Sequence, residues 1–291
     1  MRIATSQTYD RPASLMASLT QKADALQTQI STGKKYTTAS DNAGAYAQLQ
    51  SLNRADADGS AYAANVKLAQ GALAQADSTL DAIGTQLQQA QELALQASTG
   101  TLTAANRASI GASLDSILNE LVTLANTNDL RGQPMFGGAG GGTPFVKDAA
   151  GTFAFADSGD ASPIPIGDGD AVVTTVNGGR AFGDMFAALK TLSDSLATGG
   201  TVPADTLARL SAASEGVASA RASVGARALR VDLVADQQDG SKIDRAALRV
   251  DVESTDITAT VTELQKTLTI LQATQASFTK LSALSLFDYI R

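Results

Sequence analysis

The sequence contains no cysteine, no histidine and no tryptophan. Without cysteine the chain has no disulfide framework and no thiolate metal site. Without histidine it cannot build a Ser-His-Asp triad, a Cys-His pair or a histidine-ligated zinc site. Aromatic residues make up 4% of the chain, and a chain of small residues builds poor concave ligand pockets. We therefore expect no enzyme, no catalytic residues, no cofactor and no metal.

Long apolar runs are also missing, so the sequence predicts no membrane span. Residues 1–7 lack the apolar stretch of a secretory signal peptide, which predicts a cytosolic protein or one exported without cleavage. The net charge of −7 argues against nucleic acid as a partner, because binding phosphates needs a basic face. Residues 1–40 carry +3 and residues 257–291 carry +1, so the acidic surface belongs to the middle.

Both ends of the chain carry narrow apolar stripes with heptad spacing, which is typical of helices that pack along other helices. Residues 257–291 form one such stripe, broken only at Gln275. A second stripe follows Asp10, a plausible helix cap, and Pro12, which suits a first helical turn, and it stops at Gly33. We infer that the two ends pair with each other and with other copies. The alternative is that each stripe faces an ordinary globular core.

The chain of 291 residues is long enough for two or three domains. Between the end helices the pattern predicts a long helix up to about Ser98, a second helix capped by Thr103, and a third long helix after Pro203 that Asp239-Gly240 softens. The short connection at Thr99-Gly100 predicts an antiparallel hairpin. The apolar series of the first helix is Val66, Ala69, Leu73, Ala76, Leu80, Ile83, Leu87, Ala90, Ala94 and Ala97.

A glycine-rich segment separates these helices: residues 137–183 hold 12 of the 25 glycines. Short strands are predicted at residues 144–146, 152–155 and 172–176, with a turn at Ala150-Gly151. We interpret the Met and Phe residues near 135–155 and 182–186 as the core of this small insertion. The predicted fold is mainly α with a small β insertion: a long antiparallel helical-bundle rod whose N- and C-terminal helices pair at one end.

Several motifs resemble those of the flagellin superfamily. Residues 30–35 (Ile-Ser-Thr-Gly-Lys-Lys) with residues 39–42 (Ala-Ser-Asp-Asn) resemble the Ser-Gly-Lys and Ser-Asp turn motif of that superfamily. Residues 91–97 (Gln-Glu-Leu-Ala-Leu-Gln-Ala) and 223–227 (Ser-Val-Gly-Ala-Arg) resemble two further sequence motifs of the same superfamily. Within the superfamily, three features are similar to the hook–filament junction proteins rather than to filament subunits. These are Met-Phe-Gly-Gly at 135–138 before Thr-Pro-Phe at 143–145, Val-Asn-Gly at 176–178, and Leu-Ser-Leu-Phe-Asp-Tyr at 284–289.

This resemblance implies a structural protein of the bacterial flagellum. It implies a terminal helical domain of residues 1–41 and 254–291, a rod of residues 42–134 and 182–253, and an outer insertion of residues 135–181. It further implies export to the flagellum, with partners that include other copies, a second hook-associated protein, flagellin and a cytosolic chaperone. The expected self-assembly interface consists of Leu15, Leu19, Leu26, Ile30, Ile257, Val261, Leu264, Leu268, Leu271, Phe278, Leu286 and Phe287.

Three other interpretations stay open: a filament subunit, an intracellular coiled-coil adaptor, and a carboxylate-based hydrolase in the insertion. Acidic residues at Asp157, Asp160, Asp168 and Asp170 offer oxygen ligands for calcium, but their spacing does not match an EF-hand loop. Solvated acidic loops explain the cluster better.

Overall fold

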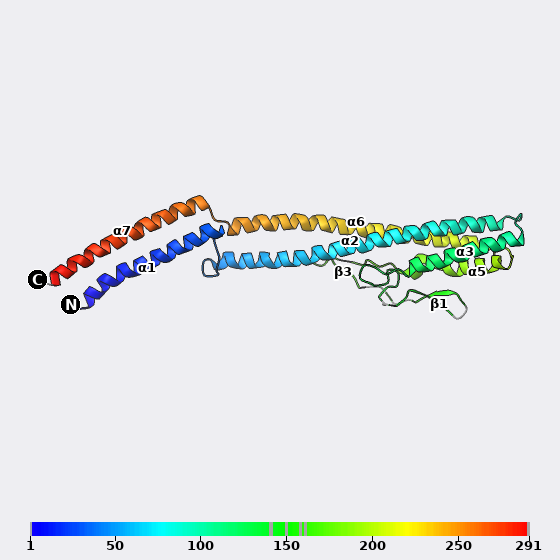
Figure 1. The fold of residues 1–291 in the computed structure, drawn as a ribbon, viewed down its shortest axis with the longest axis horizontal. Coiled ribbons are helices and arrows are strands. Elements are labelled where there is room, and N and C mark those ends of the chain that lie inside the picture. The colour runs from blue at the N-terminus through cyan, green and yellow to red at the C-terminus, as the bar shows by residue number, and fades with distance from the viewer. Residues whose placement is uncertain (1, 140–141, 149–150, 157–158, 160–161, 290–291) are drawn as a thin grey trace. The chain divides into compact units, whose positions relative to one another are not determined.

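The computed structural model describes residues 2–139, 142–148, 151–156, 159 and 162–289, and the side chains of residues 2–9 and 281–289 are not described. The helices are α1 (Arg2–Thr32), α2 (Ala43–Ser98), α3 (Ala104–Ala125), α4 (Gly178–Phe182), α5 (Met185–Ala197), α6 (Thr206–Glu253) and α7 (Ile257–Tyr289) (Figure 1). The strands are β1 (Phe145–Lys147), β2 (Phe153–Phe155), β3 (Ile164–Pro165) and β4 (Ala171–Val172). The predicted fold class, mainly helical with a small β insertion, is confirmed.

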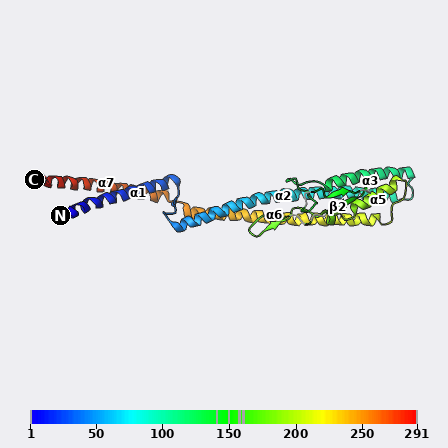
Figure 2. The same cartoon turned by 90° about the horizontal axis from the view of Figure 1, so that it is seen from below.

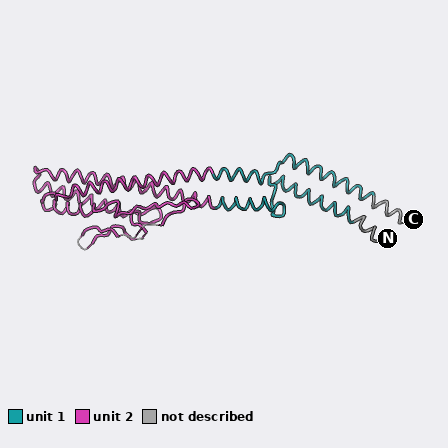
Figure 3. Tube along the Cα trace, turned by 180° about the vertical axis from the view of Figure 1, so that it is seen from behind, with its two compact units in different colours: residues 1–57, 241–291 teal, residues 58–240 magenta. Residues whose placement is uncertain are grey.

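The chain divides into two compact units (Figure 3). Unit 1 contains residues 1–57 and 241–291, and unit 2 contains residues 58–240. The predicted three-part division into terminal, rod and insertion domains stays a prediction. No helix among the described residues is long and apolar enough to cross a membrane.

The core of unit 2 is organised around α2. All ten residues of the apolar series predicted between Val66 and Ala97 are buried, and the eight from Ala69 to Ala94 are fully inaccessible. Heptad spacing keeps such residues on one face of a helix, where neighbouring helices can cover them continuously. α6 presents Leu210, Val217 and Val224 to the same core.

α3 follows α2 after a short turn and packs closely against α5 (Figure 2). Thr103 caps α3 as predicted, because its side-chain oxygen accepts a hydrogen bond from the Asn106 amide at 3.2 Å. Gly111 allows the close crossing with α5: a β-carbon there would lie 2.8 Å from the Ala197 nitrogen. Ser193 donates its hydroxyl to the Gly111 carbonyl at 3.2 Å, which leaves this buried hydroxyl satisfied.

The insertion forms two small antiparallel ladders, β1 with β2 and β3 with β4. The predicted turn between the first two strands is described at Gly151, whose φ of +82° suits glycine; Ala150 lies outside the described residues. Phe136 and Phe182 stack edge-to-face with ring centroids 5.1 Å apart. These rings are buried in one continuous core with α2, α3 and α5, rather than in a separate core of the insertion.

The strand predicted at residues 172–176 is wrong beyond Val172. The backbone groups of this segment bond elsewhere: the Arg227 guanidinium donates to the carbonyls of Val173 at 2.7 Å and Thr175 at 2.9 Å. The Val176 amide donates to the Met135 carbonyl at 3.1 Å. β3 was not predicted because it contains only two residues, one of them a proline, and so shows no alternation of apolar and polar side chains.

Two predicted helix features are also wrong. α1 is helical from Arg2, so Asp10 is not its cap and Pro12 lies inside it. A proline in a helix interior removes one backbone hydrogen bond, and here Pro12 lines a groove together with Phe278 of α7. α6 continues through Asp239-Gly240 without a break, since one glycine costs a helix only about 1 kcal/mol.

We expect Leu87→Ala to lower the free energy of unfolding of unit 2 by about 2–5 kcal/mol, because Leu87 is fully buried and its loss leaves a cavity. Leu229→Ala is the matched control. Leu229 is 73% exposed, so its replacement should change stability by no more than about 0.5 kcal/mol. Urea titration followed by circular dichroism measures both, and equal effects would contradict this account of the core.

Two glycines of α6 provide a second test. A β-carbon at Gly216 would lie 2.6 Å from the Ala181 carbonyl oxygen, whereas nothing lies within 4 Å of one at Gly225. We expect Gly216→Ala to destabilise unit 2 by about 1–3 kcal/mol through overpacking. Gly225→Ala should stabilise it by up to about 1 kcal/mol, since alanine is the better helix former. A stabilising Gly216→Ala, measured in the same titration, would show that α4 does not approach α6 so closely.

Candidate self-assembly surface of the terminal helices

α1 and α7 lie side by side and antiparallel within unit 1 (Figures 1 and 2). The line of closest contact is narrow and lined by small side chains: among residues 10–32 of α1 and 257–280 of α7, Ala23, Thr260 and Thr267 are buried. The Thr267 hydroxyl donates to the Glu263 carbonyl of its own helix at 2.8 Å, so burial leaves it satisfied. Small side chains let two helices approach closely while covering little apolar area.

Most of the residues expected at the self-assembly interface lie in or beside this contact line. The half-buried ones are Leu19, Leu26, Ile30, Val261, Leu264, Leu271 and Phe278. Leu15, Ile257 and Leu268 are 50%, 54% and 41% exposed. The side chains of Leu286 and Phe287 lie outside the described residues. Whether these residues contact other copies stays a prediction.

The contact line on α7 is rotated from the predicted stripe. It follows Thr260, Leu264, Thr267, Leu271, Thr274 and Phe278, with spacings of four, three, four, three and four. Ile257 and Leu268 therefore lie on one flank of the contact line, and Ile270, 43% exposed, lies on the other. Ile270 was missed because it falls outside the apolar heptad positions, and the buried threonines were missed because the pattern counts only apolar residues.

An ion pair crosses the two helices. Lys22 Nζ of α1 lies 2.6 Å from Glu263 Oε1 of α7, and both side chains are partly exposed. The hydrogen bond from Lys22 holds the pKa of Glu263 below its ordinary value. An exposed pair of this kind adds little stability but favours one alignment of the helices.

The segments that enter and leave the helix pair are joined directly to each other. The Lys35 amide donates to the Glu253 carbonyl at 2.7 Å, and the Thr255 amide donates to the Gly33 carbonyl at 3.1 Å. Lys34 also forms an ion pair with Glu253. Gly33 has a φ of +68°, which lets the chain leave α1 sharply, as the sequence predicts.

The turn motif of residues 39–42 acts as a connector and a helix cap. Asp41 Oδ2 accepts hydrogen bonds from the amides of Thr38 and Thr37, both at 2.9 Å, and these bonds lower the pKa of Asp41. Asn42 Oδ1 accepts the Ala45 amide at 3.0 Å and so caps α2. The residues that resemble a family motif therefore shape the route from α1 to α2.

Further along α2, a cluster of three charged residues in unit 1 joins α2 to α6. Asp56 accepts from Arg245 Nε at 2.7 Å and from Arg249 Nη2 at 2.6 Å. The bond from Arg245, with a smaller contribution from Arg249, lowers the pKa of Asp56. No local spacing in the sequence connects these residues, so the cluster could not be predicted.

The described residues offer no grouping of three acidic side chains that could hold a metal ion. Of the acidic calcium candidates, Asp157 and Asp160 lie outside the described residues. Asp170 instead pairs with Arg230 at 2.7 Å.

Residues 3–140 match the family model of the bacterial flagellin N-terminal helical region. Flagellar hook-associated protein 3 of Salmonella typhimurium is 35% identical over 138 residues, which is 47% of this chain and 44% of that protein. Its namesake from Escherichia coli is 27% identical over 286 residues, covering 89% of this chain and 90% of that protein.

Solved structures share the fold. Flagellar hook-associated protein-3 from Legionella pneumophila aligns with a TM-score of 0.65, at 13% identity, over 70% of this chain and 98% of that one. Residues 3–140 are thus similar in sequence to the N-terminal helical region of flagellins, and the fold is shared with a solved hook-associated protein-3. The similarity to hook-associated protein 3 of Escherichia coli extends along most of both chains.

Acid should act first on unit 1. Asp41, Asp56 and Glu263 all lie there, and each has a pKa held below its ordinary value in the folded chain. Each therefore stabilises the fold above about pH 4, the ordinary range of an unfolded carboxyl group, and this stabilisation is lost as pH falls through the lowered values. We expect amide hydrogen exchange to show unit 1 opening at a higher pH than unit 2.

Glu263→Gln should make the stability of unit 1 less dependent on pH in the acid range. Glu215→Gln, at an exposed position of α6 in unit 2, is the control and should leave unit 1 unchanged. Simultaneous opening of both units in acid would refute the assignment of these three carboxylates.

Proposed function

We propose that this chain is a structural hook-associated protein that joins the flagellar hook to the filament by self-assembly of its terminal helices. The observation that carries the proposal is the incomplete cover of α1 and α7. Each helix covers one side of the other, yet Leu15, Ile257, Leu268 and Ile270 remain 41–54% exposed on the flanks. Apolar rows of this kind on helices are suited to further helices.

The partner at these flanks is a second copy of the same pair. On α7, Ile257 and Leu268 lie on one flank of the pair and Ile270 lies on the other, so the pair presents two contact surfaces and successive copies can add side by side. Such heterologous contacts generate rings or helical tubes. The exposed ion pair between Lys22 and Glu263 holds the two helices in register while the flanks stay available.

The similar proteins support a position of this assembly at the junction between hook and filament. Proteins named flagellar hook-associated protein 3 match both in sequence and in fold, which favours the junction over the filament. On this proposal the chain is exported to the flagellum and meets a second hook-associated protein on the hook side and flagellin on the filament side. A cytosolic chaperone covers the apolar flanks before export, since exposed apolar patches favour aggregation.

The surface is tested by the double variant Leu268→Ser with Ile270→Ser in cells that lack the natural chain. Both side chains are exposed, so the helix pair should keep its circular dichroism while filaments fail to attach to the hook and motility is lost. Gln265→Ser with Gln272→Ser, at exposed polar positions of α7, is the matched control and should swim normally. Normal motility of the first variant would exclude these flanks from assembly.

Antibody labelling of intact flagella tests whether the protein lies at the hook–filament junction. A junction protein gives one spot at the base of each filament, and a filament subunit labels the whole length. Recovery of the chain from the medium only when the flagellar export apparatus is intact would exclude an intracellular adaptor. Labelling along the filament would replace the junction role with that of a filament subunit.

A further inference from the structure

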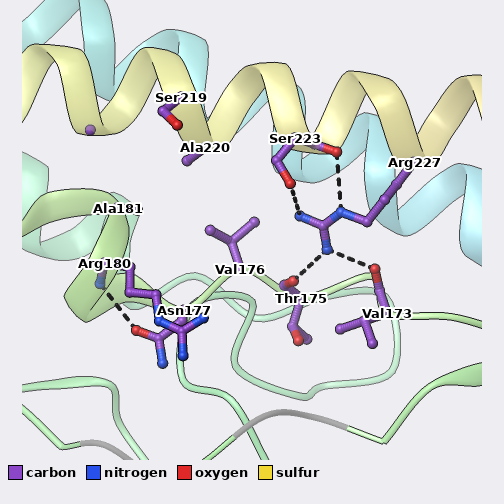
Figure 4. Close-up of a pocket in the computed structure, with 11 residues that line it drawn as sticks. Val173, Thr175, Val176, Asn177, Arg180, Ala181, Ser219, Ala220, Ser223 and Arg227 are labelled. Atoms are coloured by element: carbon purple, nitrogen blue, oxygen red, sulfur yellow. Dashed lines mark hydrogen bonds between the residues drawn. The ribbon is translucent and has the colours of Figure 1, made fainter.

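A cleft of about 530 Å³ lies in unit 2 between the middle of α6 and the segment that leads into α4 (Figure 4). Its floor is apolar and includes the buried side chains of Val176 and Ala181. Its walls are polar, with the hydroxyl groups of Ser219 and Ser223 on the α6 side. This cleft has no part in the terminal helix pair.

Arg227 places a positive charge in one wall, and no acidic side chain among the described residues pairs with it. The guanidinium is half-buried and donates to the carbonyls of Val173 and Thr175, and burial lowers the pKa of the Arg227 side chain. Nη2 has only a 3.4 Å contact with the Ser223 hydroxyl and lies on the side of Val176 (Figure 4). One donor of this cation therefore remains available to a ligand.

Arg180 supplies a second cation on the opposite side of Val176 (Figure 4). Its side chain is exposed and forms no ion pair with any described residue, while its amide donates to Asn177 Oδ1 at 3.1 Å. None of the described residues that line the cleft is acidic, although the whole chain carries a net charge of −7. The cleft is thus a basic site in an acidic protein.

We propose that this cleft binds a small dicarboxylate, with one carboxylate at Arg180, the other at Arg227 and the carbon chain over Val176. Guanidinium groups bind carboxylates through paired, charge-assisted hydrogen bonds. Two cations separated by an apolar floor match two acidic groups separated by methylene groups. The hydroxyl groups of Ser219 and Ser223 provide further donors at the same wall.

The test is isothermal titration calorimetry of the full-length chain with glutarate. We expect saturable binding of glutarate, and no binding of glutaramide, which has the same carbon skeleton without charge. Arg180→Gln should weaken glutarate binding at least about tenfold, the scale of one lost charged hydrogen bond. Arg180 is exposed, and its side chain takes no part in the hydrogen bonds from Arg227 to the Val173 and Thr175 carbonyls, so this variant should fold normally.

Arg221→Gln is the matched control, because Arg221 lies on α6 but pairs with Asp77 and Asp81 away from the cleft. It should bind glutarate as the parent chain does. Equal weakening by both variants would mean diffuse charge attraction and would overturn the proposal, as would the absence of saturable binding. Acetate or inorganic phosphate binding as tightly as glutarate would overturn the two-point recognition of a dicarboxylate.

Discussion

Two helices packed against each other can each cover only one side of the other, and this limit shapes the terminal unit. In unit 2, α2 is enclosed by several helices, and its apolar row is inaccessible to solvent. In unit 1, α1 and α7 pack on each other, and among the side chains that the structure describes on these two helices only Ala23, Thr260 and Thr267 are buried. The difference between a closed core and an open pair follows from the number of helices around each stripe.

The long helices could be predicted from the sequence because their burial is periodic. Ten apolar positions along α2 obey heptad spacing, and all ten are buried. Caps at Thr103 and the stop at Gly33 are local as well, since each depends on residues within one turn. The start of α1 was misplaced because proline favours the first turn of a helix, whereas Pro12 lies inside α1.

The path of the segment after Val172 and the ion pairs that join different helices could not be predicted, because they depend on residues far apart in the chain. The segment after Val172 has the composition of a strand, but its carbonyls bond to Arg227 of α6. The same holds for Asp56 with Arg245 and Arg249, and for Lys22 with Glu263. On α7 the apolar pattern placed the stripe part of a turn away from the residues that are buried, since it gave no weight to buried threonine.

The backbone bonds between residues 33–35 and 253–255 place the roots of the first and last helices next to each other. The chain between residues 35 and 253 therefore leaves the terminal helices and returns to them at the same position. A longer or shorter loop between residues 35 and 253 leaves the alignment of α1 and α7 unchanged. The entropic cost of a longer loop also grows slowly with its length. Related chains are free to differ greatly in size in the middle while keeping identical lengths at both ends.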